Sequence, residues 1–186
     1  PRPRKMKFTE GTAGQDVPVK EKICAGLKAE EYRIRISPEQ ILLEGSKEAG
    51  LFYARTTLGQ LRMIHGEELP CMEIDDYPAY SYRSFQIDCA RHYFSVDELK
   101  KMIRMSAEFK LNHFHWHISD DQGWRIESKC YPRLHEIGSV RAGDHFGNYH
   151  SDQKSGGYYT RDEVKDIVDY CKELGIEVVP EIDMPG

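Results

Sequence analysis

Residues 110–125, KLNHFHWHISDDQGWR, contain three histidines at alternate positions and then two adjacent aspartates. If this segment is an extended strand, His113, His115 and His117 point to one face. His113 and His117 would then lie about 13 Å apart, at about 3.3 Å per residue, which is too far for both to bind one zinc ion. One His-x-His pair could still bind a metal with ligands from elsewhere, as in metal-dependent hydrolases of barrel type. Alternatively, the histidines line the interior of a barrel and form hydrogen bonds with their neighbours.

The adjacent carboxylates of Asp120 and Asp121 repel each other unless each has a partner. They could cap a helix or lie in a solvated loop. Arg91 favours a binding site instead, because its guanidinium presents five N–H donors in a planar fork that suits sugar hydroxyls or a carboxylate. A simple ion pair with Asp88 is the alternative role for Arg91.

Strand and helix patterns alternate from residue 84 onward. Two capping boxes, Ser95 with Glu98 and Thr160 with Glu163, predict the starts of two amphipathic helices. Strand patterns occupy residues 84–90, 111–119 and 176–183, and we expect the last to be buried on both faces because it is rich in Val and Ile. This order predicts a parallel sheet covered by helices.

Two α/β architectures contain such a sheet, a doubly wound fold and a (β/α)8 barrel of the TIM type. No G-x-G-x-x-G loop follows a strand, which disfavours a nucleotide-binding doubly wound fold. Charged residues stand after each strand, where a barrel places its functional residues: Asp88, Arg91, Asp120, Asp121, Glu181 and Asp183. A whole barrel has eight strands and about 250 residues. The chain therefore holds the first three strands of an incomplete barrel, or the fold is not a barrel.

The first part of the chain has a different pattern. Residues 32–44 alternate apolar and polar side chains around a turn, as a hairpin does, and residues 46–64 place leucines at helical spacing. We expect a small α+β domain over residues 1–75 and the barrel part over residues 76–186. The segment 69–84, with its prolines, acidic residues and tyrosines, is interpreted as the joint between the two.

Composition limits the classes of partner. The 186 residues carry a formal net charge of −5, which gives no electrostatic reason to expect nucleic acid or an anionic membrane as a partner. No apolar run is long enough for a transmembrane helix and no signal peptide is recognisable, although one could have been removed. The five cysteines are scattered without a C-x-x-C pair and are expected to be reduced thiols, which slightly favours the cytoplasm and leaves export open.

Three segments together, FQIDCARHYF, KLNHFHWHISDDQGWRIES and GGYYTRDEVKDIVDYCKELGIEVVPEIDMPG, resemble glycoside hydrolase family 20, the β-N-acetylhexosaminidases, in order and spacing. EEYRIRI, ILLEG and LFYARTTLGQL are similar to the small non-catalytic domain that precedes the barrel of that family. The resemblance covers most of the chain from about residue 30. It implies hydrolysis of terminal β-linked N-acetylglucosamine or N-acetylgalactosamine with retention, the 2-acetamido group of the substrate serving as nucleophile.

The resemblance also implies roles for single residues. Arg91 matches the arginine that binds hydroxyls of the terminal sugar, and Asp120 matches the aspartate of a hydrogen-bond relay behind the general acid. Asp121 is a further candidate for substrate binding. Trp124 is given no role, because the substrate-stacking tryptophans of the family lie farther along its barrel. Ser84 stands where the family commonly has glycine.

The catalytic Asp-Glu pair of the family has no counterpart in this chain, and the relay histidine would follow Gly186. We therefore expect no turnover by this chain alone. The resemblance implies no cofactor and no metal, and it implies N-acetylhexosamine-containing oligosaccharides or glycoconjugates as partners, with a homo-oligomer possible. Two other functions stay open: a metal-dependent barrel hydrolase that uses a His-x-His pair, and a non-catalytic sugar-binding or assembly module.

Overall fold

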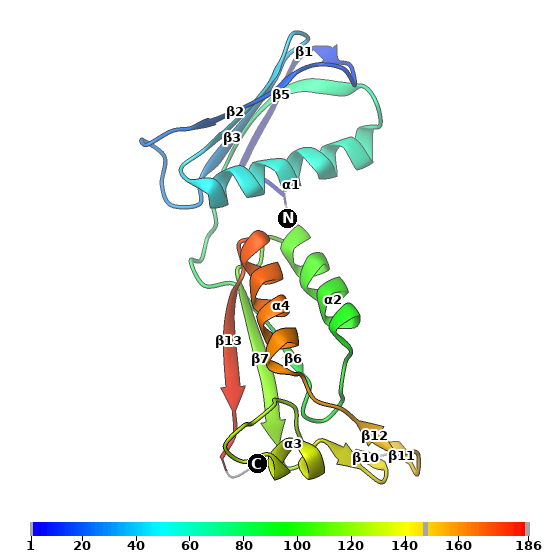
Figure 1. Cartoon of the computed structure of the whole chain (residues 1–186). Coiled ribbons are helices and arrows are strands. Elements are labelled where there is room, and N and C mark those ends of the chain that lie inside the picture. Colours follow the sequence, from blue (N-terminus) through cyan, green and yellow to red (C-terminus); the bar gives the residue numbers. More distant parts are fainter. Residues whose placement is uncertain (1, 147–148, 185–186) are drawn as a thin grey trace. The chain divides into compact units, whose positions relative to one another are not determined.

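The computed structural model describes residues 2–146 and 149–184, which divide into two compact units, Pro1–Ser81 and Tyr82–Gly186. The first unit is a five-stranded sheet with one helix lying along it (Figure 1). The strands follow the order β1-β5-β3-β4-β2. The elements are β1 (Lys5–Ala13), β2 (Val19–Ile23), β3 (Tyr32–Ile36), β4 (Ile41–Gly45), α1 (Glu48–His65) and β5 (Leu69–Asp76).

One hydrophobic core holds this unit together. The predicted hairpin is confirmed, since β3 pairs antiparallel with β4 and their apolar residues alternate with half-buried ones. The helix α1 is confirmed as well, and its leucines meet the sheet. The core residues that these elements share are Ile34, Ile36, Ile41, Leu43, Leu51, Ala54, Leu58 and Leu61.

The segment 69–84 was expected to be the joint, and this prediction is wrong for its first half. Residues Leu69–Asp76 form β5, which pairs with both β1 and β3. The burial pattern of β5 is irregular and so lacks the alternation of a typical strand. Pro70 lies where β5 pairs with β1 beyond the end of the β3 ladder. A proline is tolerated there because it removes no donor from a second ladder.

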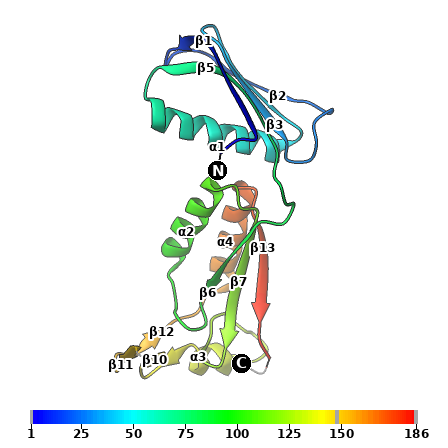
Figure 2. The ribbon, with the colours of Figure 1, turned by 180° about the vertical axis from the view of Figure 1, so that it is seen from behind.

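The second unit is built on the parallel sheet β13-β7-β6. Its two longer helices pack against each other and cover one face of the sheet (Figures 1 and 2). The elements are β6 (Ser84–Asp88), α2 (Val96–Glu108), β7 (His113–Asp120), β8 (Gly123–Trp124), α3 (Arg133–Gly138), β9 (Val140–Arg141), β10 (Asp144–Phe146), β11 (Tyr149–Ser151), β12 (Ser155–Gly156), α4 (Arg161–Glu173) and β13 (Glu177–Ile182).

Both predicted capping boxes are present. The side chain of Ser95 accepts from the backbone of Glu98 at the start of α2, and Thr160 does the same with Glu163 at the start of α4. Gly175 follows α4 with φ of 67°, a conformation that glycine adopts without strain. Helices α2 and α4 therefore begin where the sequence predicted.

The alternation in β7 sorts its side chains between the two faces of the sheet. Phe114, Trp116 and Ile118 are buried, with exposed fractions of 0%, 1% and 2%. The histidines occupy the other face, as expected from the period of two. The expectation that residues 176–183 are buried on both faces is wrong, because β13 is half-exposed along most of its length. In the described part of the chain β13 has a strand neighbour on one side only, β7, so fewer side chains cover it.

All five cysteines are unpaired, as predicted. Among the described helices, none combines the length and the apolar character needed to cross a membrane.

Candidate functional site

The site begins with one row of side chains across the parallel sheet. In the registers of the two ladders, Asp88 of β6 lies beside His117 of β7, and Glu181 of β13 lies on the other side of His117. Residues that are paired in neighbouring strands point to the same face. The sheet thus brings together three ionisable groups near the carboxyl ends of its strands.

Arg91 lies just beyond β6 and joins this row. Its backbone N–H donates to Asp88 Oδ1 over 3.1 Å, and its Nη1 donates to Asp88 Oδ2 over 2.9 Å. Nη2 lies 2.5 Å from Asp120 Oδ2. Arg91 therefore does form an ion pair with Asp88. Even so, 40% of the Arg91 side chain is exposed, so the guanidinium is not fully covered. Arg91 is held in place by two carboxylates and still presents a surface to a ligand.

His117 stands at the centre of the cluster and is almost fully buried. Its Nε2 lies 3.0 Å from Asp120 Oδ2 and 2.9 Å from Arg91 Nη1, and its Nδ1 lies 2.8 Å from Glu181 Oε2. Burial by itself lowers the pKa of His117, but the contacts with Glu181 and Asp120 outweigh burial and hold that pKa above its ordinary value. The two carboxylates thus shift the protonation equilibrium of His117 toward the imidazolium form.

The carboxylates show the complementary shifts. The backbone N–H of Asp121 donates to Asp120 Oδ1 over 2.7 Å, and this bond, with His117 and Arg91, holds the pKa of Asp120 below its usual range. His117, together with His115, likewise lowers the pKa of Glu181. Asp120 and Glu181 are therefore anionic at neutral pH, and the cluster alternates negative and positive groups.

The other two histidines also contact their neighbours. His115 Nε2 lies 2.6 Å from Glu181 Oε2, and His113 Nδ1 lies 2.7 Å from Asn112 Oδ1. The expected hydrogen bonds to neighbouring side chains are present for His113 and His117, whereas His115 contacts Glu181 as an ion pair. The Glu181 carboxylate contacts both His115 and His117.

A possible metal site shares these residues. Within the described ranges, His117, Asp120 and Asp183 each offer one ligand atom within 4.8 Å of the others. The Arg91 guanidinium already contacts both His117 and Asp120, and a positive group at that place opposes the binding of a cation. The cluster is therefore better suited to holding an arginine than a metal ion.

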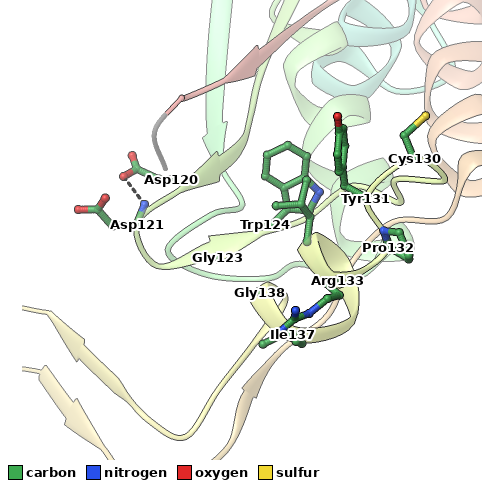
Figure 3. Close-up of a pocket in the computed structure, with 11 residues that line it drawn as sticks. Asp120, Asp121, Gly123, Trp124, Cys130, Tyr131, Pro132, Arg133, Ile137 and Gly138 are labelled. Atoms are coloured by element: carbon green, nitrogen blue, oxygen red, sulfur yellow. Dashed lines mark hydrogen bonds between the residues drawn. The ribbon is translucent and has the colours of Figure 1, made fainter.

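Asp121 is less closely involved than its neighbour. Its side chain is exposed, and its contact with the cluster runs through the backbone N–H (Figure 3). Asp120 and Asp121 line a pocket of about 680 Å³ together with Trp124, Tyr131 and Ile137 (Figure 3). Trp124 is fixed there by a hydrogen bond from its Nε1 to the carbonyl of Ile126.

Sequence reasoning named every strand-end group of the cluster. It considered His117 only as a metal ligand or as a hydrogen-bonding residue of the barrel interior, and it gave Glu181 no specific role. Their part depends on the register of β7 against β13, which no local pattern contains. The period-two histidines were the available signal, because they marked the face on which the row would form.

Comparisons with known proteins agree for both units. The model of the glycosyl hydrolase family 20 catalytic domain matches residues 80–186, and that of glycosyl hydrolase family 20, domain 2, matches residues 1–77. A beta-hexosaminidase of Porphyromonas gingivalis is 40% identical over 97% of this chain and 24% of its own length. A beta-N-acetylhexosaminidase of Cellulomonas fimi is 37% identical over 100% of this chain and 36% of its own length.

Solved structures give the same result. The crystal structure of a GH20 exo beta-N-acetylglucosaminidase from Vibrio harveyi, in complex with N-acetylglucosamine, superposes with a TM-score of 0.90 at 30% identity. The superposition covers 100% of this chain and 36% of that one. This chain thus spans between about a quarter and just over a third of the length of these relatives. With both of its units matched in order, the chain belongs to glycoside hydrolase family 20.

Proposed function

We propose that the protein carrying this chain is a β-N-acetylhexosaminidase that removes terminal β-linked N-acetylglucosamine or N-acetylgalactosamine with retention. The observation that carries the proposal is the Arg91 guanidinium, held by Asp88 and Asp120 at the ends of two parallel strands yet 40% exposed. The names of the relatives, beta-hexosaminidase and beta-N-acetylhexosaminidase, support it.

The architecture follows from the same proposal. We infer that β6, β7 and β13 are the first three strands of a (β/α)8 barrel, because they are parallel, joined through helices and charged at their carboxyl ends. The five-stranded unit would then be the non-catalytic domain, and the site would belong to residues 76–186.

Each site residue has a role that its surroundings support. Arg91 binds hydroxyls of the terminal sugar, since a guanidinium fork donates several hydrogen bonds in one plane. Asp120 is the anionic member of the relay and holds the histidine that in turn contacts the general acid. Its lowered pKa keeps Asp120 ionised in this role. Asp121, exposed beside the pocket, is the weaker candidate for substrate contact.

The chemistry in the complete protein is substrate-assisted. The 2-acetamido oxygen attacks the anomeric carbon as a glutamic acid protonates the leaving oxygen, and water then opens the oxazolinium ion. The Asp-Glu pair for these steps has no counterpart in this sequence, so we expect the 186-residue chain by itself to show no turnover.

The test is hydrolysis of a chromogenic N-acetyl-β-glucosaminide by the full-length protein, with and without a thiazoline that mimics the oxazolinium ion. Turnover that the thiazoline blocks and that EDTA leaves unchanged is expected. Turnover that EDTA abolishes and zinc restores would instead favour the metal-dependent hydrolase. No turnover with N-acetylglucosaminide or N-acetylgalactosaminide would reject the proposal and favour a sugar-binding or assembly module.

A further inference from the structure

The backbone that carries Arg91, residues 89–94, is held by side chains from a distant part of the chain. Four of its carbonyl oxygens, those of Cys89, Ala90, Arg91 and Phe94, accept hydrogen bonds from Arg125, Arg141 and Tyr159. All three donors belong to the segment between β7 and α4. This segment therefore does more than connect a strand to a helix.

Arg125 grips the residues immediately before Arg91. Its Nε donates to the carbonyl of Cys89 over 2.9 Å, and its Nη2 donates to that of Ala90 over 2.8 Å. Nη1 donates to the carbonyls of Ser139 and Gly157. The exposed fraction of Arg125 is 0%. Burying a guanidinium is costly unless its donors are satisfied, and here backbone carbonyls satisfy them.

Arg141 binds the backbone of Arg91 itself. Its Nη2 donates to the carbonyl of Arg91 over 2.8 Å, and its Nη1 donates to the carbonyl of Gln122 over 2.7 Å. Gln122 lies in the turn between Asp121 and β8. One side chain thus links the turn that follows the two aspartates to the peptide that carries the sugar-binding arginine.

The backbone at Gly123 packs closely against the Arg125 guanidinium. A Cβ atom added at Gly123 would lie 2.5 Å from Arg125 Cζ, closer than any real contact. Tyr159, fully buried, donates its hydroxyl proton to the carbonyl of Phe94 over 2.6 Å and closes the far end of the segment. Side-chain donors therefore hold the backbone of residues 89–94 at both of its ends.

We propose that Arg125 and Arg141 are positioning residues for Arg91, because they hold the carbonyls of residues 89, 90 and 91 and so set the direction of the Arg91 side chain. The proposal rests on the proposed role of Arg91 in sugar binding. We call these two residues the brace, and in this proposal neither of them contacts substrate. Their effect on the reaction passes through the backbone of Arg91, and a shift of about 1 Å in such a group can change the rate by about a hundredfold.

A double-mutant cycle in the full-length protein tests this. Arg141→Met removes both donors, and Arg91→Ala removes the group that the brace positions. With Arg91 present, Arg141→Met is expected to lower kcat/KM by about tenfold, mainly through KM. In the Arg91→Ala background the same change is expected to alter kcat/KM by less than about twofold, since nothing is left to position. Arg141→Lys, which keeps one donor, should recover part of the loss.

Arg125→Lys and Arg125→Met are made in parallel, and amide hydrogen exchange over residues 88–94 is followed in every variant. The brace variants should exchange faster in this segment. Arg104→Met is the matched control, because Arg104 lies exposed on α2, paired with Glu108 in an i,i+4 ion pair. It should change neither exchange in this segment nor kcat/KM.

Equal losses from Arg141→Met in both backgrounds would overturn the proposal and leave Arg141 a purely structural role. An unchanged exchange rate over residues 88–94 would also overturn it. If Arg91→Ala leaves kcat/KM intact, the proposed function of Arg91 is wrong, and hydrogen exchange alone then decides whether the brace exists.

Discussion

At the scale of single residues, the most informative feature is the cluster of acidic and basic side chains around Arg91. Arg91 and His117 contact three carboxylates at distances of 2.5–3.0 Å, those of Asp88, Asp120 and Glu181. The Nε2 atom of His117 contacts both Asp120 and Arg91. When protonated it donates to Asp120, and when neutral with its proton on Nδ1 it accepts from Arg91. The protonation state of this imidazole therefore decides whether its Nε2 atom bonds to Asp120 or to Arg91.

Replacing Arg91 by lysine should weaken substrate binding while keeping the charge. An ammonium group cannot hold both carboxylates and sugar hydroxyls in one plane. Loss of one hydrogen bond to a charged group costs about 1.5–3 kcal/mol, which is about a 10- to 100-fold fall in kcat/KM. Steady-state kinetics of the full-length protein measure this, with Arg104→Lys as the control. Unchanged kinetics would show that Arg91 does not contact substrate.

His117→Gln should destabilise the second unit in a pH-dependent way. The pKa of His117 is raised, so its stabilisation is complete below the unfolded pKa of about 6.5 and is lost as the pH rises through the folded pKa. Asp120 and Glu181 have lowered pKa values, so their stabilisation is present above about 4.3 and is lost as the pH falls through the folded values. The effect of the substitution is therefore expected to be largest between about pH 4.3 and 6.5.

Urea unfolding followed by tryptophan fluorescence can measure this, because both tryptophans, Trp116 and Trp124, lie in the second unit. The free energy of unfolding of His117→Gln and of the unchanged chain is compared at about pH 5.5 and pH 8.5, on either side of the unfolded histidine pKa. His65→Gln, at the exposed end of α1 in the other unit, is the control. A difference that stays constant with pH would contradict the ionised form of His117.

At the scale of elements, local chemistry defined α2, α4 and β7, whereas β1 and β5 escaped prediction. Nearly every residue of β1 is exposed, so it shows no alternation. In β5 the buried positions are irregularly spaced, and buried residues flank the proline, Pro70. Both strands are held by pairing with other strands, Met72 and Ile74 of β5 pairing on two sides. A strand whose stability comes from its neighbours has a weak local signal.

The capping box of α2 makes a stability prediction. Ser95→Ala removes the side-chain acceptor for the Glu98 N–H and should lower the free energy of unfolding by about 0.5–2 kcal/mol. Ser95→Thr keeps an acceptor and should lose much less. Urea unfolding monitored by tryptophan fluorescence distinguishes the two variants. Equal stability of the alanine and threonine variants would show that the cap contributes nothing.

At the scale of the whole molecule, the edge of the parallel sheet decides behaviour in solution. In the described part of the chain, β13 pairs with β7 alone, and Ile182 and Met184 at its end are 43% and 82% exposed. An unpaired edge offers backbone donors and acceptors to another chain. The same surface is where we infer that the next barrel strand belongs in the complete protein.

The isolated 186-residue chain is therefore expected to self-associate as its concentration rises. Ile182→Lys should reduce this, because a charge at the strand edge must be desolvated when strands pair. Met63→Lys, which adds the same charge to an exposed position on α1 of the first unit, should not. Sedimentation velocity over a concentration series measures the effect. A chain that stays monomeric throughout would contradict an accessible β13 edge.

The sequence by itself determined the hairpin and helix of the first unit, the two capped helices, the alternation in β7 and the residue types that gather after each strand. These follow from contacts within a few residues, such as Ser95 with Glu98, or from a period of two. Motifs in order also carried the resemblance to the family. All of these features are local, so they can be recognised in the sequence without knowledge of the fold.

Only the tertiary structure decided which of those residues meet. The registers of β6 and β13 against β7 place Asp88, His117 and Glu181 in one row, and a shift of one residue would have sent them to opposite faces. The placement of Arg125 and Arg141 against the backbone of residues 89–91 joins positions 35 to 50 residues apart. Such contacts are set by strand pairing and close packing over the whole unit, so no segment of the sequence specifies them alone.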